Sequence, residues 1–379
     1  MLESIALHNY HCFVDFKLEL SARLLIVGSN GSGKTSLWKA LAGLQDVVVR
    51  GTEVATAYPS RTLTRWQNNR TQRFELDLRL SEDRYHYELH LAHGQKTNAP
   101  VIGLERLTLL GNAPRPLYEL LDGEVRLFGD DPSPAPRTSF RFNGKRSFLP
   151  DLEERPDNRR LTAFRAALGD AWLLAPTDRR MEATSKEDAL WLERNGQNLA
   201  SWLRSAFAER AGVSATLLKD LRTVMPGLKD MGLKPISREA RELELRFEAA
   251  GVPYQIAVDE LSDGQRVLLF LYAFLRGAAD RAGMAFIDEP ETGLAPHEMQ
   301  PWLSAVASEL EDHGGQLVVA SHHPEVVDYL APHRTVRFSR PEGGAVRADE
   351  ITLETTSGAR VSEWIGRPWA YEDEGKDEP

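Results

Sequence analysis

Hydrophobic and polar residues alternate with a period of two in several segments of the chain. In residues 14–20 every second side chain is apolar and its neighbours are charged, which predicts a strand buried on one face. The same alternation occurs in 74–80 and 85–91, with a short polar turn between them, and predicts a hairpin. A second hairpin is expected from 243–247 and 254–258.

Other segments carry the apolar spacing of helices. A fully apolar strand is expected at 23–27, and apolar residues then recur at helical spacing in 37–44 and through much of 161–225. From 259 to 338 the order helix, strand, helix, strand, helix, strand predicts the parallel sheet of an α/β protein. Residues 130–138 contain three prolines and are predicted to form a surface loop.

The most apolar run of the chain directly follows a very polar turn. Nine uninterrupted apolar residues, 267–275, come after Ser262-Asp263-Gly264-Gln265-Arg266. The run is far shorter than the roughly 20 residues that a membrane-spanning helix needs. We therefore expect a buried helix with a polar N-terminus.

Composition favours an ordinary globular protein and argues against several classes of site and partner. The chain has 379 residues, 42% of them hydrophobic and 27% charged, which suits two domains or one two-lobed unit. Its single cysteine, Cys12, can build neither a disulfide framework nor a zinc site and is expected in the core. The formal net charge of −10 argues against a nonspecific nucleic-acid coat but allows a local basic patch. No signal peptide is visible, so a cytoplasmic location is expected.

A phosphate-binding loop is predicted at 28–36, "GSNGSGKTS". Gly28, Gly33, Lys34 and Thr35 occupy the fixed positions of G-x-x-x-x-G-K-[ST], between a predicted buried strand and a predicted helix. Glycines let consecutive backbone N–H groups point at phosphate oxygens, and the helix adds its positive N-terminal end. Lys34 is expected to neutralise the β- and γ-phosphates, and Thr35 to offer its hydroxyl to Mg²⁺. The other predicted nucleotide-binding residues of this loop are Ser29, Asn30, Gly31, Ser32 and Ser36.

Two further predicted strands end in residues that suit hydrolysis. The apolar run 284–287 is followed by Asp288 and Glu289, which point to opposite sides of a strand end. We assign Asp288 to the metal and Glu289 to the general base that activates the attacking water. The next strand ends in "SHH", where His322 is expected to contact the γ-phosphate or the water, and His323 is expected to be an exposed turn residue.

Taken together, these motifs resemble the ATPase heads of the ABC type. The loop at 28–35, "LSDGQ" at 261–265, "FIDEPETGL" at 286–294 and "SHHP" at 321–324 follow the order of such a head, most closely in the RecF, SMC and OLD group of stand-alone AAA-type ATP-binding proteins. The resemblance implies an α/β P-loop NTPase with two lobes, a mostly parallel core sheet, an antiparallel β subdomain and a helical insertion.

The resemblance also implies domain limits and a mode of action. The head would span 1–345, with an N-terminal lobe at 1–175, the helical insertion at 176–250 and a C-terminal lobe at 251–345, followed by an acidic tail at 346–379. Two heads of this group close face to face around two ATP molecules. By position, the side chains that would contact the ATP of the other copy are Ser262, Gly264 and Gln265, and 293–296 would be the D-loop.

Three features depart from related groups. Lys34 and Ser262 lie 228 residues apart, far wider than in transporter ATPases. The segment expected to supply the Q-loop glutamine, 172–180, contains none, so Asp178 is the candidate there. Only 57 residues follow His322, too few for the Toprim nuclease domain of OLD proteins, and no sustained heptads predict a coiled coil.

The leading hypothesis is an ATP-driven molecular switch with Mg²⁺ as its metal. A homodimer would close on ATP and act on DNA or on a separately encoded effector, in DNA repair or anti-phage defence. Two basic segments with interleaved aromatic residues, 61–73 and 137–148, give limited support to DNA binding. The alternatives are a non-hydrolysing ATP-dependent scaffold, a transporter ATPase subunit and a complete nuclease, and no membrane contact is expected.

Overall fold

The computed structural model describes residues 1–94, 99–133, 135–176, 181–210, 212–351 and 362. The chain divides into two compact units, which are described separately. Unit 1 comprises Met1–Ala171 and Val336–Ile351. Unit 2 comprises Trp172–Thr335 and, among the described residues, Ser362.

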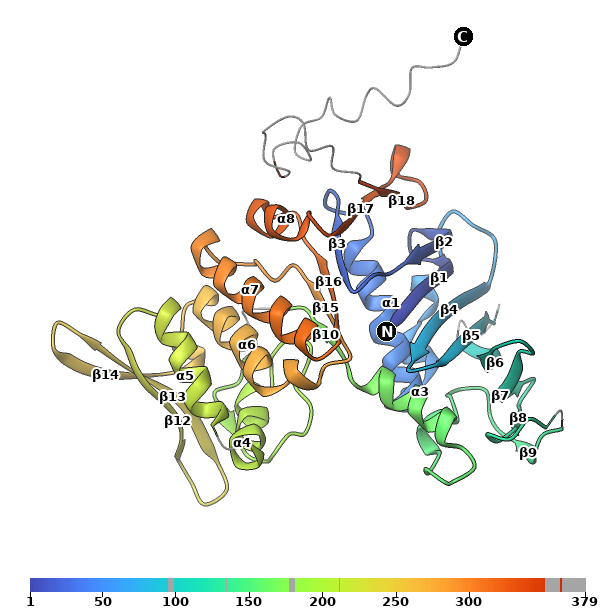
Figure 1. The fold of residues 1–379 in the computed structure, drawn as a ribbon, viewed down its shortest axis with the longest axis horizontal. Helices are drawn as coiled ribbons and strands as arrows, with labels where there is room; N and C mark the ends of the chain where they lie inside the picture. The colour runs from blue at the N-terminus through green and yellow to red at the C-terminus, as the bar shows by residue number, and fades with distance from the viewer. Residues whose placement is uncertain (95–98, 134, 177–180, 211, 352–361, 363–379) are drawn as a thin grey trace, which may run out of the picture. The chain divides into compact units, whose positions relative to one another are not determined.

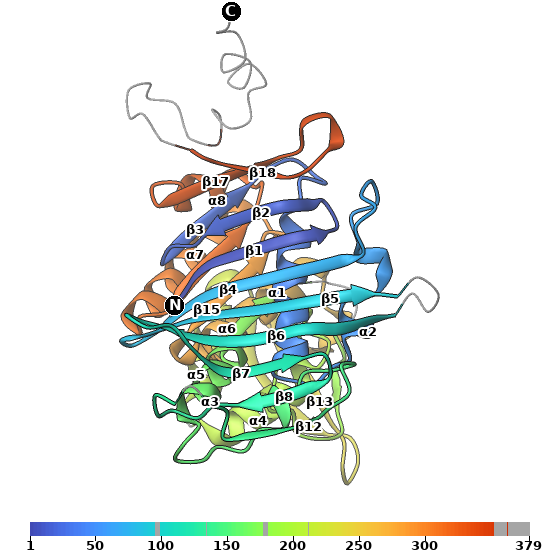
Figure 2. The same ribbon diagram turned by 90° about the vertical axis from the view of Figure 1, so that its right-hand side faces the viewer.

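An eight-stranded antiparallel sheet forms the framework of unit 1 (Figure 2). Both predictions for this region are confirmed: residues 14–19 of the segment 14–20 lie in β2, and 74–91 forms a hairpin in which Leu80 pairs with Asp83. The strand order is β2-β1-β4-β5-β6-β7-β8-β9. The strands are β1 (Leu2–Tyr10), β2 (Phe13–Glu19), β4 (Thr71–Leu80), β5 (Asp83–His93), β6 (Pro100–Leu110), β7 (Arg115–Leu121), β8 (Glu124–Leu127) and β9 (Thr138–Arg141).

Three helices cover the apolar face of this sheet: α1 (Lys34–Val48), α2 (Val54–Ala57) and α3 (Arg159–Gly169). The predicted helical stripe of α1 is confirmed, since Leu37, Leu41 and Leu44 are all buried. The Gln45 side chain donates to the carbonyl oxygens of Leu168 and Ala171 at 2.8 and 2.7 Å, which joins α1 to the end of α3.

The strand before the predicted phosphate loop is β3 (Arg23–Val27), which is almost entirely buried. It lies next to β17 (Arg334–Ser339), and β17 pairs antiparallel with β18 (Arg347–Glu350). The predicted core position of Cys12 is also confirmed, because its side chain is buried in unit 1.

A buried carboxyl group lies within the antiparallel sheet. Glu105 on β6 is fully buried and accepts hydrogen bonds from the hydroxyls of Tyr87, Tyr118 and Ser147 at 2.9, 2.8 and 2.7 Å. Burial raises the pKa of Glu105 above its ordinary value, although these three hydrogen bonds act in the opposite direction. The folded protein therefore favours the neutral form of this acid more than the unfolded chain does.

Unit 2 contains the α/β order predicted for 259–338 (Figure 1). The parallel strands β15 (Met284–Asp288) and β16 (Gln316–Ala320) are completely buried, and β10 (Ala171–Leu174) lies beside β15. The helices are α6 (Asp263–Gly277), α7 (Pro296–Asp312) and α8 (Pro324–Leu330). The apolar run 267–275 is buried on every side of α6, as predicted, and Trp302 of α7 donates its indole N–H to Leu271 O.

The expected helical insertion at 176–250 is only partly helical. It contains α4 (Leu199–Glu209) and α5 (Val213–Val224), but also β11 (Thr184–Ser185), β12 (Leu228–Pro235) and β13 (Arg241–Ala249). The helical spacing predicted through 161–225 holds for α3, α4 and α5 and is wrong between α3 and α4, where β10, β11 and turns lie. Proline and glycine in that stretch, Pro176 and Gly196, disfavour a continuous helix.

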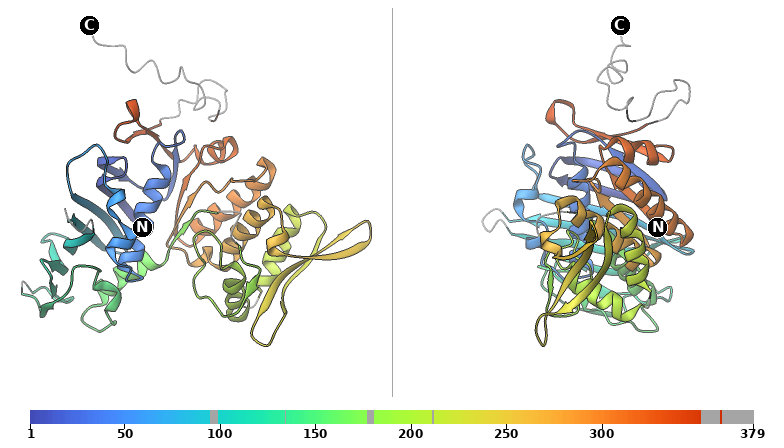
Figure 3. Two further views of the ribbon diagram at one scale, coloured as in Figure 1. Left: turned by 180° about the vertical axis from the view of Figure 1, so that it is seen from behind. Right: turned by 90° about the vertical axis from the view of Figure 1, so that its left-hand side faces the viewer.

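The second predicted hairpin is confirmed as β13 and β14 (Val252–Ala257), with Ala249 opposite Val252. This hairpin extends beyond the helices of unit 2 in Figure 1 and in the left view of Figure 3. One face of the sheet packs its apolar residues, including Leu243 and Leu245, out of water. Its end is exposed, and Val252 and Tyr254 are 65% and 46% accessible to solvent.

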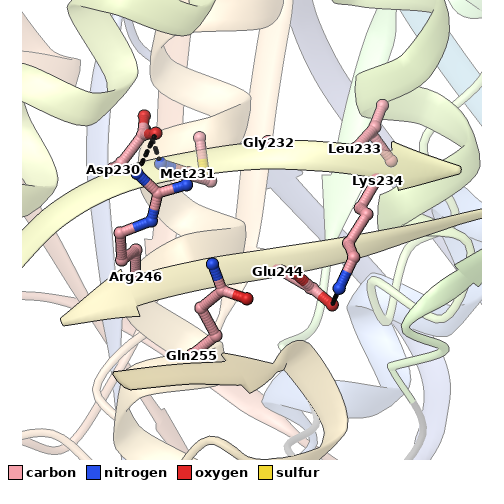
Figure 4. A pocket seen from close by; sticks show the side chains of 8 residues that line it. All are labelled: Asp230, Met231, Gly232, Leu233, Lys234, Glu244, Arg246 and Gln255. Carbon is pink, nitrogen blue, oxygen red and sulfur yellow. Dashed lines mark hydrogen bonds and ion pairs between the residues drawn. The ribbon is translucent and has the colours of Figure 1, made fainter. Parts of the chain in front are cut away.

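The face of this sheet that carries the charged residues has a hollow of about 300 Å³ (Figure 4). Gly232 lines it, and a Cβ added there would meet no atom within 4 Å. The side chains on either side form two ion pairs, Arg246 with Asp230 at 3.6 Å and Lys234 with Glu244 at 3.2 Å. The charges lining the hollow are thus already paired within the sheet.

We predict that Glu105→Gln makes the stability of the protein less dependent on pH. The wild-type acid has a raised pKa in the folded state, so its contribution is fully present below the ordinary carboxyl pKa and is lost as the pH rises through the folded pKa. An amide does not titrate and removes this loss. Denaturant unfolding between pH 4 and pH 8 measures the slope for both proteins, and identical slopes would contradict the prediction.

Candidate functional site

The loop between β3 and α1 has the backbone shape that its glycines predict. Gly33 has a φ of 113°, and a Cβ added there would lie 2.9 Å from Val346 Cγ2 and 3.2 Å from Cys12 Sγ. Gly31 has a φ of 78° but faces open space. The loop is therefore closely packed at Gly33 and open to solvent at its tip, where Ser29, Asn30 and Gly31 are exposed.

Lys34 and the start of α1 are suited to a phosphate group. The Lys34 side chain is only 4% exposed, and its ammonium donates to the carbonyl oxygens of Gly28 and Ser29 at 2.6 and 3.2 Å. No side chain caps the N-terminus of α1, whose N-cap is Gly33. The Ser32 hydroxyl is buried and has no hydrogen-bond partner among the described residues. A fixed cation, an uncapped helix N-terminus and a spare hydroxyl donor fit an anionic phosphate.

Arg340, which sequence reasoning did not single out, supports the tip of this loop. It follows β17, and its Nη1 donates to Gly31 O at 3.1 Å. Its guanidinium also lies 5.7 Å from the centroid of the Trp66 ring, which is half exposed. Arginine at a turn has no motif of its own, so only the folded chain shows that Arg340 holds the loop.

The two carboxylates at the end of β15 differ in their exposure to solvent. Asp288 is buried, with 7% exposure, whereas the Glu289 side chain is 36% exposed. Glu289 has a φ of 50°, a conformation that non-glycine residues rarely adopt, and its backbone N–H donates to Ala320 O at 2.8 Å. This bond to the last residue of β16 fixes the reversal of the chain after the strand.

The two histidines after β16 differ in their surroundings. His323 is the N-cap residue of α8, and its Nδ1 accepts a hydrogen bond from Glu325 N at 3.2 Å. The His322 ring is 57% exposed, and its Nδ1 lies 3.7 Å from Glu289 Oε1. In unit 2 the structure thus brings His322, and not His323, close to the expected base.

Glu291 and Ser321 join this group, and sequence reasoning missed both. The Ser321 hydroxyl is buried and donates to Glu291 Oε1 at 2.6 Å. The signal in the sequence was weak: a second acid in "DEPE" has the appearance of a turn residue, and a serine after a strand is common. Only the fold shows that Glu291 is 7% exposed instead of solvated.

The turn before α6 forms a capping box. Ser262 is the N-cap residue: its hydroxyl accepts from Gln265 N at 3.3 Å, and Gln265 Oε1 accepts from Ser262 N at 3.1 Å. A Cβ on Gly264 would lie 2.7 Å from Gly293 O, so this turn is packed against the segment predicted as the D-loop. The Ser262 side chain is exposed, which leaves it accessible to another molecule.

The residues proposed for a metal are Thr35, which is exposed in unit 1, and Asp288 in unit 2. A different group, Glu75, Glu88 and His90 on β4 and β5, brings its ligand atoms within 4.8 Å of one another. Its acids are already close to Arg73 and Arg106, at 3.8 and 3.5 Å. The Q-loop candidate Asp178 and most of the tail at 346–379 lie outside the described residues.

The basic segments proposed for DNA are engaged in local contacts. In 137–148, Arg137 pairs with Asp131 and Asp157, and Arg146 makes two bonds to Asp151. Two aromatic side chains of this segment, Phe140 and Phe142, each pack edge-on against Phe148. In 61–73, Arg70 donates to the carbonyl oxygens of His93 and Gly94. These contacts weaken the sequence argument for a DNA surface at 137–148.

Comparisons with known proteins show the family to which the chain belongs and solved structures with a similar fold. Residues 24–328 match the family described as "AAA domain, putative AbiEii toxin, Type IV TA system". A search of curated proteins found no match. Among solved structures, an SmcHead bound to the C-winged helix domain of ScpA is similar with a TM-score of 0.54 at 14% identity, covering 94% of this chain and 99% of that one.

A second structure, an Smc head domain with an extended coiled coil bound to the C-terminal domain of ScpA from Pyrococcus furiosus, has a TM-score of 0.52 at 12% identity. The match covers 93% of this chain and 96% of that one. At such identity the likeness concerns the fold, which is that of a P-loop ATPase head, as the motifs predicted. Within the described residues, no helix is both long and apolar enough to span a membrane.

We predict that Gly33→Ala destabilises the protein more than Gly31→Ala. Both positions have a positive φ, which should cost about 1 kcal/mol for alanine. Only at Gly33 does the new methyl also collide with Val346 and Cys12, so a loss of about 3 kcal/mol is expected there. Denaturant unfolding of the two variants measures the difference, and equal losses would show that the packing around Gly33 is loose.

Proposed function

Because the chain belongs to the AAA domain family that it matches over residues 24–328, we propose that it is an ATP-hydrolysing molecular switch. In this proposal two copies close around two ATP molecules and reopen after hydrolysis. The observation that carries it is the loop at 28–36, where a buried Lys34 ammonium, an uncapped helix N-terminus and a close-packed Gly33 form a phosphate-binding cradle.

The proposed roles follow from the chemistry of each side chain. Lys34 neutralises phosphate charge once it exchanges the carbonyl oxygens of its own loop for phosphate oxygens. Thr35 and Asp288 are the oxygen donors that would hold Mg²⁺, which supplies charge stabilisation at the transferred phosphate. Glu289 accepts the proton of the attacking water, and its part-exposed carboxylate is free to reach that water.

His322 is proposed to contact the γ-phosphate or the attacking water. Its ring is exposed and lies beside Glu289, so it can take up a hydrogen bond without giving up a partner that fixes the turn. His323 cannot play this role while its ring caps α8. The exposure of His322 beside Glu289 and the capping role of His323 therefore support His322 as the histidine of this site.

The turn at 261–265 is proposed to contact the ATP that another copy holds. Ser262, Gly264 and Gln265 lie at the N-terminus of a 15-residue helix, whose dipole favours an anion at that end. The capping box fixes the turn, and the buried apolar run behind it keeps the helix rigid. Such a preorganised terminus suits binding in trans.

The output of the switch is proposed to pass to a separately encoded effector in anti-phage defence, with DNA repair as the second setting. The family description names a toxin–antitoxin system, and toxin–antitoxin systems consist of more than one component. The two Smc heads were solved with a domain of a partner protein, ScpA. DNA is a candidate partner with less support, because two cations of 137–148, Arg137 and Arg146, are paired with nearby acids.

A non-hydrolysing scaffold is the alternative that shares the same ATP-binding residues. The presence of Glu289 beside His322 favours hydrolysis over it. A transporter ATPase subunit is disfavoured by the 228 residues that separate Lys34 from Ser262. A nuclease would need metal-binding carboxylates of its own, and the group at Glu75, Glu88 and His90 is close to arginines.

We predict that Glu289→Gln retains ATP binding but lowers hydrolysis by at least about 100-fold, because an amide cannot accept the proton of the attacking water. The variant should accumulate as an ATP-bound dimer in size measurements by light scattering. Lys34→Ala is the matched control and should lose ATP binding itself. A Glu289→Gln protein that remains monomeric at saturating ATP would exclude the dimer switch.

We predict that Ser262→Arg abolishes ATP-dependent dimerisation and hydrolysis while the monomer still binds ATP. The long cationic side chain would block the helix terminus at which the second copy's nucleotide is proposed to bind. Since Ser262 also caps α6, Ser262→Ala serves as a control that loses about 1 kcal/mol of cap energy without adding bulk. Unchanged hydrolysis in Ser262→Arg would remove the trans role.

A further inference from the structure

Glu291 is a buried acid whose contacts hold one particular turn. Its side chain is 6% exposed, and it lies three residues after the end of β15. One oxygen, Oε1, accepts hydrogen bonds from the Ser321 hydroxyl at 2.6 Å and from His322 N at 3.4 Å. Both donors belong to the turn that follows β16.

Ser321 extends this contact to the next residue. Its oxygen donates to Glu291 and at the same time accepts from His323 N at 3.0 Å. A single carboxylate oxygen therefore restrains all three residues of the turn, two of them directly and His323 through the Ser321 hydroxyl. Because Ser321 is completely buried, water does not compete for these bonds.

These bonds set the position of the His322 ring. Its Nδ1 lies 3.7 Å from Glu289 Oε1 and 3.9 Å from Glu291 Oε1. The His322 side chain makes few contacts that could hold it in place, since it is 57% exposed. Its distance from Glu289 depends on the backbone of the turn, and Glu291 holds that backbone through its bonds to Ser321 and His322 N.

Only one of the two carboxylate oxygens of Glu291 is hydrogen-bonded to the turn. The second oxygen of Glu291, Oε2, is buried and has no hydrogen-bond partner among the described residues. A buried carboxylate with one unpaired oxygen is costly, and an apolar residue of similar size would pack with less penalty. The bonds that Oε1 accepts from the turn after β16 are what an apolar residue could not supply.

We propose that Glu291 is a positioning residue for ATP hydrolysis, which holds the Ser321–His323 turn so that the His322 ring stays beside Glu289. This inference rests on the proposed function. Glu291 touches neither nucleotide nor water in this proposal and acts only through Ser321 and His322.

The test compares Glu291→Ala, Glu291→Gln and Ser321→Ala in the full chain. Glu291→Ala should lower kcat by about 10- to 100-fold, the size of effect expected from a misplacement of about 1 Å, and leave KM within about 3-fold. Glu291→Gln retains an oxygen acceptor, so its kcat should be higher than that of Glu291→Ala but lower than that of wild type. Ser321→Ala removes the shorter of the two bonds to Glu291 Oε1, so its kcat should lie between that of wild type and that of Glu291→Ala.

A matched control separates positioning from loss of stability. Asp280 is an acid with a structural role in the same unit, because its carboxylate accepts from Arg210 Nη1 at 3.1 Å beside the end of α6. Asp280→Ala should lower the melting temperature without a change in kcat. If it lowers kcat as much as Glu291→Ala does, the proposal is overturned.

A second readout does not depend on activity. The ring proton signals of His322, assigned by their loss in His322→Gln, should shift in Glu291→Ala without nucleotide and stay unchanged in Asp280→Ala. Unchanged signals together with a wild-type kcat in Glu291→Ala would overturn the proposal. If the wild-type protein neither binds nor hydrolyses ATP, the proposed function fails, whereas the His322 signals still report whether Glu291 holds the turn.

Discussion

Complete burial of short strands limits where this chain can place charged side chains. β3, β15 and β16 are almost entirely inaccessible to water, so charged side chains appear only at the ends of these strands or beyond them. At these ends the backbone must turn, and its polar groups need partners. The loop after β3 uses the Lys34 ammonium for this purpose, and the turn after β15 uses the carbonyl oxygen of Ala320. The same constraint therefore satisfies the backbone and fixes the groups that are proposed to bind phosphate or to activate water.

The fixed position of these groups favours a reaction at the strand ends. A cation or carboxylate that is already held in place loses little free energy to rearrangement when the reaction begins. Gly33 allows a close-packed loop, Arg340 holds its tip through Gly31, and Glu289 adopts a left-handed backbone. Glu291 extends this principle to the turn after β16. Gly33, Arg340 and Glu291 are thus proposed to hold reacting residues or their loops in place without taking part in the reaction.

The outer parts of both units differ from these strand ends in the way they handle charge. Nearby acids pair with Lys234 and Arg246 on the sheet of β12, β13 and β14, and with Arg137 and Arg146 in the segment 137–148. Paired surface charges contribute little to stability and offer less to a polyanion than free ones do. By contrast, the end of the β13–β14 hairpin exposes apolar side chains, Val252 and Tyr254 among them. Such a surface is more suited to a protein than to DNA.

Local patterns in the sequence were sufficient for much of this protein. Alternation determined the strands of both hairpins, helical spacing determined α1 and α6, and the loop at 28–36 followed from its glycines and Lys34, since each depends on residues close together in the chain. The helical prediction failed between α3 and α4, where packing decided that β10 and β11 form. Arg340, Ser321 and Glu291 could not be found in this way. Arg340 lies 309 residues from Gly31, and Glu291 lies 30 from Ser321. Their roles come from contacts that form only when the strands have been brought together in the fold. Glu291 holds the turn after β16 because folding buries its carboxylate next to Ser321.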